Sequence, residues 1–253
     1  MTERVNDAFI TKLAGVSALL SVVVQFGAMG IAVNLGIRPG GAINFGDGTQ
    51  LLAANANHTA NVLGVSLATL SPAMALPFGL GLYVMLKPAK AYALLGVIMF
   101  YVGMTIAFVH EVLRIALFAR LPPAYVQAAE AARPAILALG DLIQHAQEMF
   151  DLIAFVVMFG LGFTAFAFAM LSLRVVPRWL GWVLLMLAVG IGLIGRPLGF
   201  FGVAAAGIAV VLGMLVFFVW LTAMAVVLLR WSPQESPRPS AQFDQHESIQ
   251  SVI

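Results

Sequence analysis

The 253-residue chain contains no cysteine and few charged residues, since only 9% of it is Asp, Glu, Lys or Arg. Without cysteine it forms no disulfide, offers no thiolate to a metal and attaches no haem through thioether bonds. Any metal must therefore be held by His and carboxylate side chains. At 62% hydrophobic, the composition lies outside the range of soluble globular proteins and indicates a membrane protein with no role in nucleic-acid binding.

Long runs without Asp, Glu, Lys, Arg or His divide the sequence, and we interpret six of them as transmembrane helices of an all-α bundle. About 20 apolar residues span the roughly 30 Å hydrocarbon core of a bilayer. The last run is too long for one crossing and too short for two, so residues 197–205 are expected to form an outer turn. The six runs are residues 13–37, 59–86, 91–109, 152–173, 179–195 and 197–229.

Basic residues gather at both termini and in the second and fourth connections between these runs. Cytoplasmic connections carry an excess of Lys and Arg, so both termini are predicted to lie in the cytoplasm. Residues 1–231 are predicted to form the membrane domain and residues 232–253, rich in Pro, Ser and Gln, a disordered cytoplasmic tail. The basic residues concerned are Arg4, Lys12, Lys87, Lys90, Arg174, Arg178, Arg230 and Arg238.

The segment from His110 to Asp151 is the most polar part of the chain and holds five of its 11 acidic residues. Arg120 precedes Leu121, Pro122 and Pro123, which predicts the end of the third helix. Pro134 can open the next helix, and nothing breaks a helical pattern over residues 135–173. At 1.5 Å per residue that helix would be nearly 60 Å long, so it must project beyond the bilayer or bend.

A polar stripe is predicted on this long helix, because Asp141, His145 and Glu148 fall within about 60° of one another at 100° per residue, with Asp151 on the flank. On the third helix, His110 and Arg114 share a face beside Glu111. One interpretation is structural: the charges lie at the outer boundary, and Arg114 and Arg120 pair with Glu111, Glu148 or Asp151.

Two chemical interpretations of the same cluster stay open. His110, His145 and Glu148, with Glu111 or Asp141, are suitable ligands for Zn²⁺ or non-haem iron, although their spacing completes no metal motif. In the second interpretation, His110 and His145 are the two axial ligands of a haem. The carboxylates would otherwise form a proton or ion relay.

Three short segments carry a resemblance to a known family. They are Leu52 to Asn57 before the second run, Glu111 with Arg114 in the third helix, and Val176 to Trp182 at the start of the fifth. In these segments the chain resembles a bacterial family of six-span membrane proteins, domain of unknown function 4386, over roughly residues 13–198. The resemblance implies a six-helix architecture in the inner membrane and names no substrate.

The leading functional expectation is a non-enzymatic membrane subunit that acts through helix packing and through a membrane protein partner or a homo-oligomer, with no cofactor. The first alternative is a Zn- or Fe-dependent membrane enzyme with its site at the outer ends of the third and fourth helices. The second is a small-solute or proton-coupled transporter, in which Pro72 and Pro77 bend the second helix beside a gated path.

Overall fold

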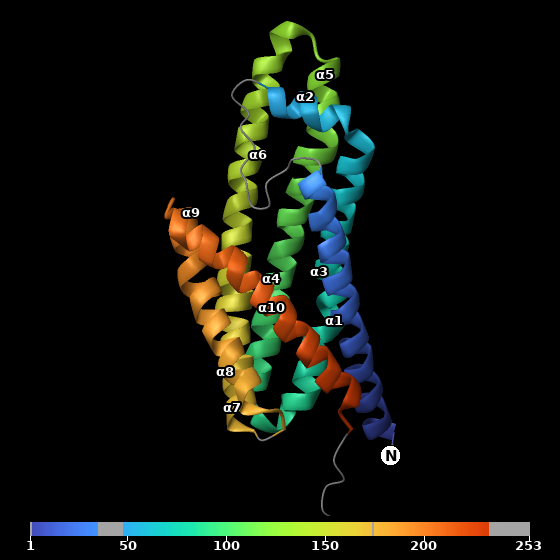
Figure 1. The fold of residues 1–253 in the computed structure, drawn as a ribbon, viewed down its shortest axis with the longest axis vertical. Coiled ribbons are helices and arrows are strands. Elements are labelled where there is room, and N and C mark those ends of the chain that lie inside the picture. The colour runs from blue at the N-terminus through green and yellow to red at the C-terminus, as the bar shows by residue number, and fades with distance from the viewer. Residues whose placement is uncertain (1, 35–47, 174, 233–253) are drawn as a thin grey trace, which may run out of the picture.

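The computed structural model describes residues 2–34, 48–173 and 175–232. Within these ranges every regular element is a helix, and six continuous helices are long and apolar enough to cross a membrane. Figure 1 shows them as one elongated bundle. The predicted all-α, six-helix fold is confirmed, whereas the predicted tail lies, apart from Ser232, outside the described residues.

Some of the six long helices combine α-helical with π-helical segments. The π-helical segments are η2, η4 and η5, whereas η1 and η3 are short 3₁₀ turns. The elements in chain order are α1 (Thr2–Asn34), α2 (Thr49–Ala56), α3 (His58–Leu86), η1 (Lys87–Ala89), α4 (Ala91–Ile115), η2 (Ala116–Arg120), α5 (Leu121–Gln127), η3 (Glu130–Ala132), α6 (Arg133–Ala154), η4 (Phe155–Phe163), α7 (Thr164–Ser172), α8 (Arg178–Leu187), η5 (Ala188–Gly195), α9 (Arg196–Phe200) and α10 (Ala204–Arg230).

The predicted end of the third helix at Arg120 is wrong, because the helix continues through η2 and α5 to Gln127. Pro122 and Pro123 follow the π-helical turn and lie in the first turn of α5. A proline there costs no helical hydrogen bond, because the amides of a first turn have no partner within the helix. The prolines therefore restart the helix instead of ending it.

The predicted outer turn at residues 197–205 is also wrong, because here too a proline follows a π-helical segment and the helix continues. The fifth helix runs from Arg178 to Phe200, and Pro197 lies in the first turn of α9, directly after the π-helical segment η5. Residues 201–203 alone connect it to α10, with Gly202 at a φ of 85°. In the second helix, α3 is likewise continuous through Pro72 and Pro77.

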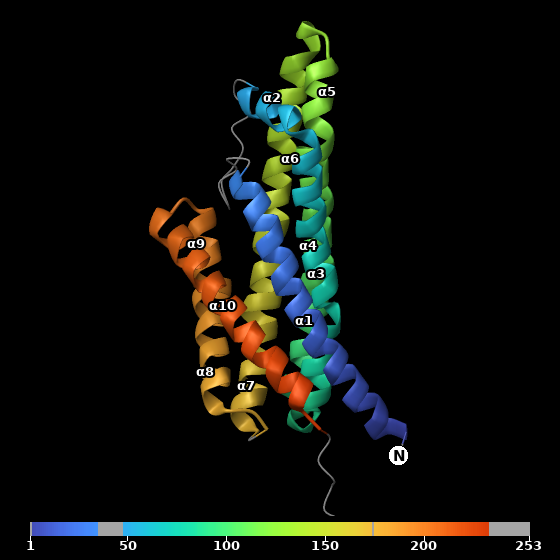
Figure 2. The same cartoon turned by 45° about the vertical axis from the view of Figure 1, so that its right-hand side comes forward.

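The fourth helix is unbroken from Glu130 to Ser172, a length of about 64 Å at 1.5 Å per residue. Its first half extends beyond the ends of neighbouring helices. α5 and the first half of α6 stand well beyond the adjoining ends of α9 and α10, and α2 lies across them (Figures 1 and 2). We call residues 116–150, which comprise η2, α5, η3 and most of α6, the outer hairpin.

The outer hairpin has a small hydrophobic core of its own, shared with α2. Leu51 of α2 is buried against Leu117, Leu121 and Tyr125, and the partly buried residues around them are Phe118, Ile136, Leu137 and Ile143. The guanidinium of Arg133 lies 5.5 Å from the ring centre of Tyr125, within cation–π distance. Helix α2 was not among the predicted elements, although its Leu51, Leu52 and alanines favour a helix.

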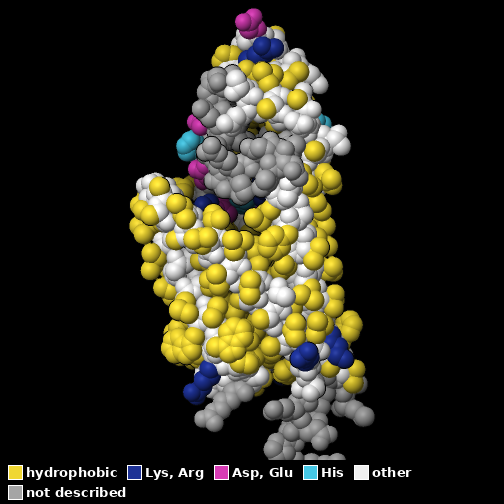
Figure 3. Space-filling model, viewed as in Figure 1, with side chains coloured by type: hydrophobic (Ala, Val, Ile, Leu, Met, Phe, Trp, Pro, Cys, Tyr) yellow, Lys and Arg dark blue, Asp and Glu magenta, His cyan; other side chains and the backbone are white. Residues whose placement is uncertain are grey.

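The opposite end of the bundle carries the described chain ends together with the α3–α4 and α7–α8 connections (Figure 1). Nζ of Lys87 lies 2.6 Å from Oδ2 of Asp7, which joins the start of α1 to the α3–α4 connection. Lys and Arg side chains lie at this end, below a broad hydrophobic band (Figure 3). Trp179 and Trp182 are exposed at the start of α8, as in the aromatic belts of membrane interfaces.

Candidate functional site

The charged residues of three neighbouring helices lie at one level of the bundle. Glu111 follows the start of α4 by 20 residues, Arg196 follows the start of α8 by 18, and Asp151 precedes the end of α7 by 21. At 1.5 Å per residue these separations are about 27–32 Å, which is the thickness of the hydrocarbon core. The three side chains therefore lie about one hydrocarbon thickness from the end of the bundle that carries the described termini, at the level where the outer hairpin begins.

Asp151 and Arg196 form the ion pair at one side of this level. Nη2 of Arg196 donates a hydrogen bond to Oδ2 of Asp151, and the side chains are 30% and 17% exposed respectively. The guanidinium also lies 5.7 Å from the ring centre of Phe155 in the helical turn below. The pair joins the fourth helix to the fifth.

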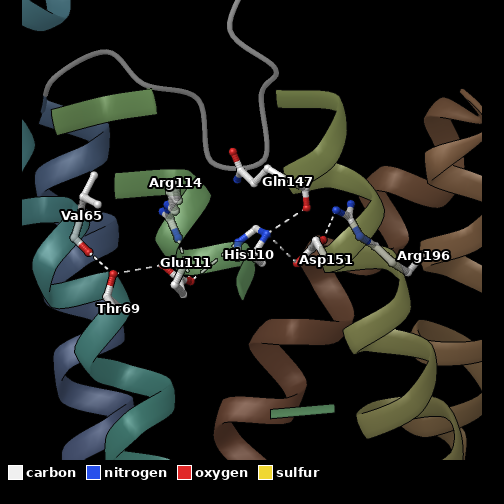
Figure 4. A network of polar contacts seen from close by, with 8 residues as sticks. All are labelled: Val65, Thr69, His110, Glu111, Arg114, Gln147, Asp151 and Arg196. Carbon is white, nitrogen blue, oxygen red and sulfur yellow. Dashed lines mark hydrogen bonds and ion pairs between the residues drawn. The ribbon is translucent and has the colours of Figure 1, made fainter. Parts of the chain in front are cut away.

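His110 lies between this pair and the buried Glu111, as Figure 4 shows. Its Nδ1 is 3.2 Å from the carbonyl oxygen of Gln147 and 3.8 Å from Oδ1 of Asp151. A carbonyl oxygen only accepts hydrogen bonds, so in this contact the N–H at Nδ1 donates a hydrogen bond to Gln147. Nε2 faces Glu111, with 3.7 Å to its Oε1.

Glu111 has partners on both sides. Nη1 of Arg114 lies 3.4 Å from its Oε1, and Oγ1 of Thr69 lies 3.2 Å from its Oε2. The Thr69 hydroxyl is also 3.0 Å from the carbonyl of Val65 in α3, so it donates to one of the two acceptors at a time. We call Thr69, His110, Glu111, Arg114, Gln147, Asp151 and Arg196 the boundary network.

In the boundary network the carboxylates of Glu111 and Asp151 are matched by the guanidiniums of Arg114 and Arg196, with His110 between the two pairs. It joins α3, α4, α6 and α9, which belong to the second, third, fourth and fifth helices of the bundle. Each buried charge in it has an ionic partner, as a low-dielectric environment requires. Chemically it is a structural tie between helices.

The predicted partners of these charges are only partly correct. Arg114 does pair with Glu111, but Asp151 pairs with Arg196 and not with Arg114, and Arg120 reaches none of its predicted acidic partners among the described residues. Arg196 was missed because the expected outer turn placed it in a connection. Its 18-residue separation from Arg178, one membrane thickness, was the signal that could have placed it in the bundle.

The predicted polar stripe on α6 lies on the exposed side of the outer hairpin. Nδ1 of His145 donates to the carbonyl oxygen of Asp141 at 2.8 Å and lies 3.6 Å from its carboxylate, and both side chains are exposed. Gln144 donates to Oε1 of Glu148 at 3.1 Å. His145 lies outside the uncharged spans, and its hydrogen bond to the Asp141 carbonyl, followed by the Asp141 charge, raises its pKa.

The predicted metal ligands are not gathered into one site. His110 points inward to Gln147 and Asp151, whereas His145 is bonded to Asp141 on the exposed side. Among the described residues, no three His, Asp or Glu side chains are arranged to hold a metal ion. The predicted ligands His110, His145 and Glu148 therefore do not form one donor group in this arrangement, and the metal and haem hypotheses stay predictions.

We expect the His145→Ala variant to have the same zinc and iron content as the wild type, and a closely similar thermal stability, because His145 makes only local contacts on an exposed surface. Elemental analysis and a visible absorption spectrum of both purified proteins measure this. Near-stoichiometric zinc or iron in the wild type, lost in the variant while the fold persists, would show that the metal hypothesis is correct.

The boundary network extends from α3 to α9 at one level of the bundle. Below it, residues 70–86, 91–109, 152–173, 179–195 and 204–229 of the second to sixth helices contain no Asp, Glu, Lys, Arg or His. The core there is aromatic and aliphatic, with Phe78, Phe100, Phe163, Phe166 and Trp220 among its fully buried side chains. The relay hypothesis stays a prediction.

No protein-family model, curated protein or solved structure matches the chain. The resemblance to the six-span family therefore stays a prediction.

Proposed function

We propose that the chain is a non-enzymatic subunit of a bacterial inner membrane that presents the outer hairpin, on the side opposite its termini, to a protein partner. The observation that supports this proposal is the hairpin itself. It extends beyond the outer boundary, encloses its own small core with α2, and stands on a charge-balanced network. The basic residues at the opposite end favour cytoplasmic termini.

The outward side of α6 supplies the binding surface. Leu142 precedes Asp151 by nine residues, so it lies about 14 Å beyond the boundary level, while a headgroup layer is only about 5–8 Å thick. It is nevertheless 67% exposed, and Leu139 and Met149 on the same side are exposed as well. Lipid chains do not reach Leu139 and Leu142, and an apolar surface of this kind is typical of a site for protein binding.

The boundary network supports the same role because it fixes the base of the hairpin. Glu111 and Asp151 hold α4 and α6 to each other through His110 and to their neighbours through Thr69 and Arg196. A surface held by packed helices on a rigid base loses little conformational entropy when it binds.

The test uses single-cysteine and photo-crosslinking variants, and it benefits from a chain without native cysteine. We expect Asp141→Cys to react with a membrane-impermeant maleimide in intact cells, and Arg178→Cys only after the membrane is opened. A photoreactive amino acid at Leu142 should give a discrete protein adduct on illumination. The control is Val112, which is 65% exposed on α4 at the membrane boundary and should give none.

Two outcomes would overturn the proposal. Labelling of Arg178→Cys, but not of Asp141→Cys, in intact cells would place the hairpin in the cytoplasm. The absence of any protein adduct at Leu142, or an equal adduct at Val112, would show that the outward side of α6 is not a specific binding surface.

A further inference from the structure

We propose that the partner bound by the outward side of α6 is a second copy of this chain, so that two α6 helices pair in parallel; this inference rests on the proposed function. The contact residues on each copy form what we call the α6 seam. They are Leu139, Leu142, Ala146, Met149 and Ile153.

The spacing of the α6 seam is that of a coiled coil. Its members follow one another at intervals of three, four, three and four residues, which are the a and d positions of a heptad repeat. All are exposed except Ala146, which is half-buried. An apolar seam with a period of 3.5 residues packs along the whole length of another helix when the two supercoil.

Membrane insertion restricts how two copies can meet. Both copies cross the bilayer in the same direction, so the twofold axis that relates them is perpendicular to the membrane. Their α6 helices then run parallel and at the same height, and each residue of the seam faces its own equivalent. Leu142 packs on Leu142 and Met149 on Met149.

The charges of α6 fit this self-pairing. Asp141 and Glu148 both occupy position c of the heptad, outside the contact, so no like charges face each other across the seam. The edges, positions e and g, hold Ala138, Ile143, His145, Phe150 and Leu152, of which only His145 is ionisable. A partner of different sequence is usually selected by complementary charges at these edges, which α6 does not offer.

The height of the seam gives a further reason. Leu139 and Leu142 lie about 18 Å and 14 Å beyond Asp151, where lipid chains do not reach, while Ile153 lies just below it, at the edge of the hydrocarbon. A second α6 helix covers both parts at once, because it crosses the same boundary at the same residues.

Disulfide trapping tests the pairing. In a parallel pair the d positions of the two helices face each other within reach of a disulfide bond, whereas the neighbouring c positions point away. In native membranes treated with an oxidant, we expect most of Leu142→Cys to migrate at twice the chain mass on non-reducing gels, and Met149→Cys likewise. Asp141→Cys is the matched control, since it is exposed and adjacent, and should remain monomeric.

Each result decides the question. If Leu142→Cys stays monomeric, or crosslinks no better than Asp141→Cys, the second copy is excluded. If the photoreactive residue at Leu142 then still gives an adduct of another mass, the proposed function stands with a different partner. If neither experiment gives an adduct, both proposals fail.

Discussion

Replacing Arg196 with methionine is expected to lower the free energy of unfolding by about 3 kcal/mol, the lower end of the usual cost of breaking a buried ion pair, because this pair is only partly buried. The Asp151 side chain, 17% exposed, would be left at this level with only His110 facing it, 3.8 Å away. Denaturant or thermal unfolding in detergent micelles measures the loss.

Two further variants separate the ion pair from side-chain packing. The double variant Asp151→Leu with Arg196→Met leaves neither charge behind, so it should recover most of the lost stability. Lys87→Met removes the Lys87–Asp7 ion pair at the end of the bundle that carries the described termini, but Lys87 is 42% exposed and the expected cost is about 0–1 kcal/mol. An Arg196→Met variant as stable as Lys87→Met would show that partial burial does not strengthen the Asp151–Arg196 pair.

Replacing Gly192 with alanine is expected to cost about 1–3 kcal/mol, the usual effect of overpacking a tight contact. A Cβ atom at Gly192 would lie 2.4 Å from the backbone nitrogen of Gly160 and 2.9 Å from the carbonyl carbon of Phe159. These are backbone atoms, so the fourth and fifth helices would have to separate. The same unfolding measurement, or the loss of monodisperse protein on heating, detects it.

Gly190 provides the matched control, because it lies in the same π-helical segment and a Cβ atom there meets nothing within 4 Å. Alanine also favours a helix over glycine by about 1 kcal/mol, so Gly190→Ala should be neutral or slightly stabilising. If both variants lose the same free energy of unfolding, the close contact between Gly192 and the fourth helix is not the cause of the loss.

The sequence predicts the six spans well, because lipid leaves almost no alternative to an uncharged helix of about 20 residues. The ends of the helices are less predictable. Pro122 and Pro197 stop a regular α-helix, but a π-helical segment precedes each of them and the helix restarts at the proline. Nothing in the residue pattern announces that local change of hydrogen bonding, which depends on packing against the neighbouring helices.

The boundary network is predictable in its location and only partly in its contacts. The separation of His110, Glu111 and Asp151 from the inner ends of their helices places them at the outer boundary from sequence alone. Which acid meets which base depends on how far each helix is rotated about its axis, and that comes from packing. The Asp151–Arg196 pair also required Arg196 to be inside a helix, which the predicted outer turn excluded.

The unbroken fourth helix has a mechanical consequence. One stiff rod of 43 residues begins in the outer hairpin and ends at the α7–α8 connection on the opposite side of the membrane. The boundary network contacts this helix near its middle, through Asp151. A force applied to the outer hairpin therefore acts on the same continuous helix whose other half packs against the fifth helix, where Gly160 meets Gly192.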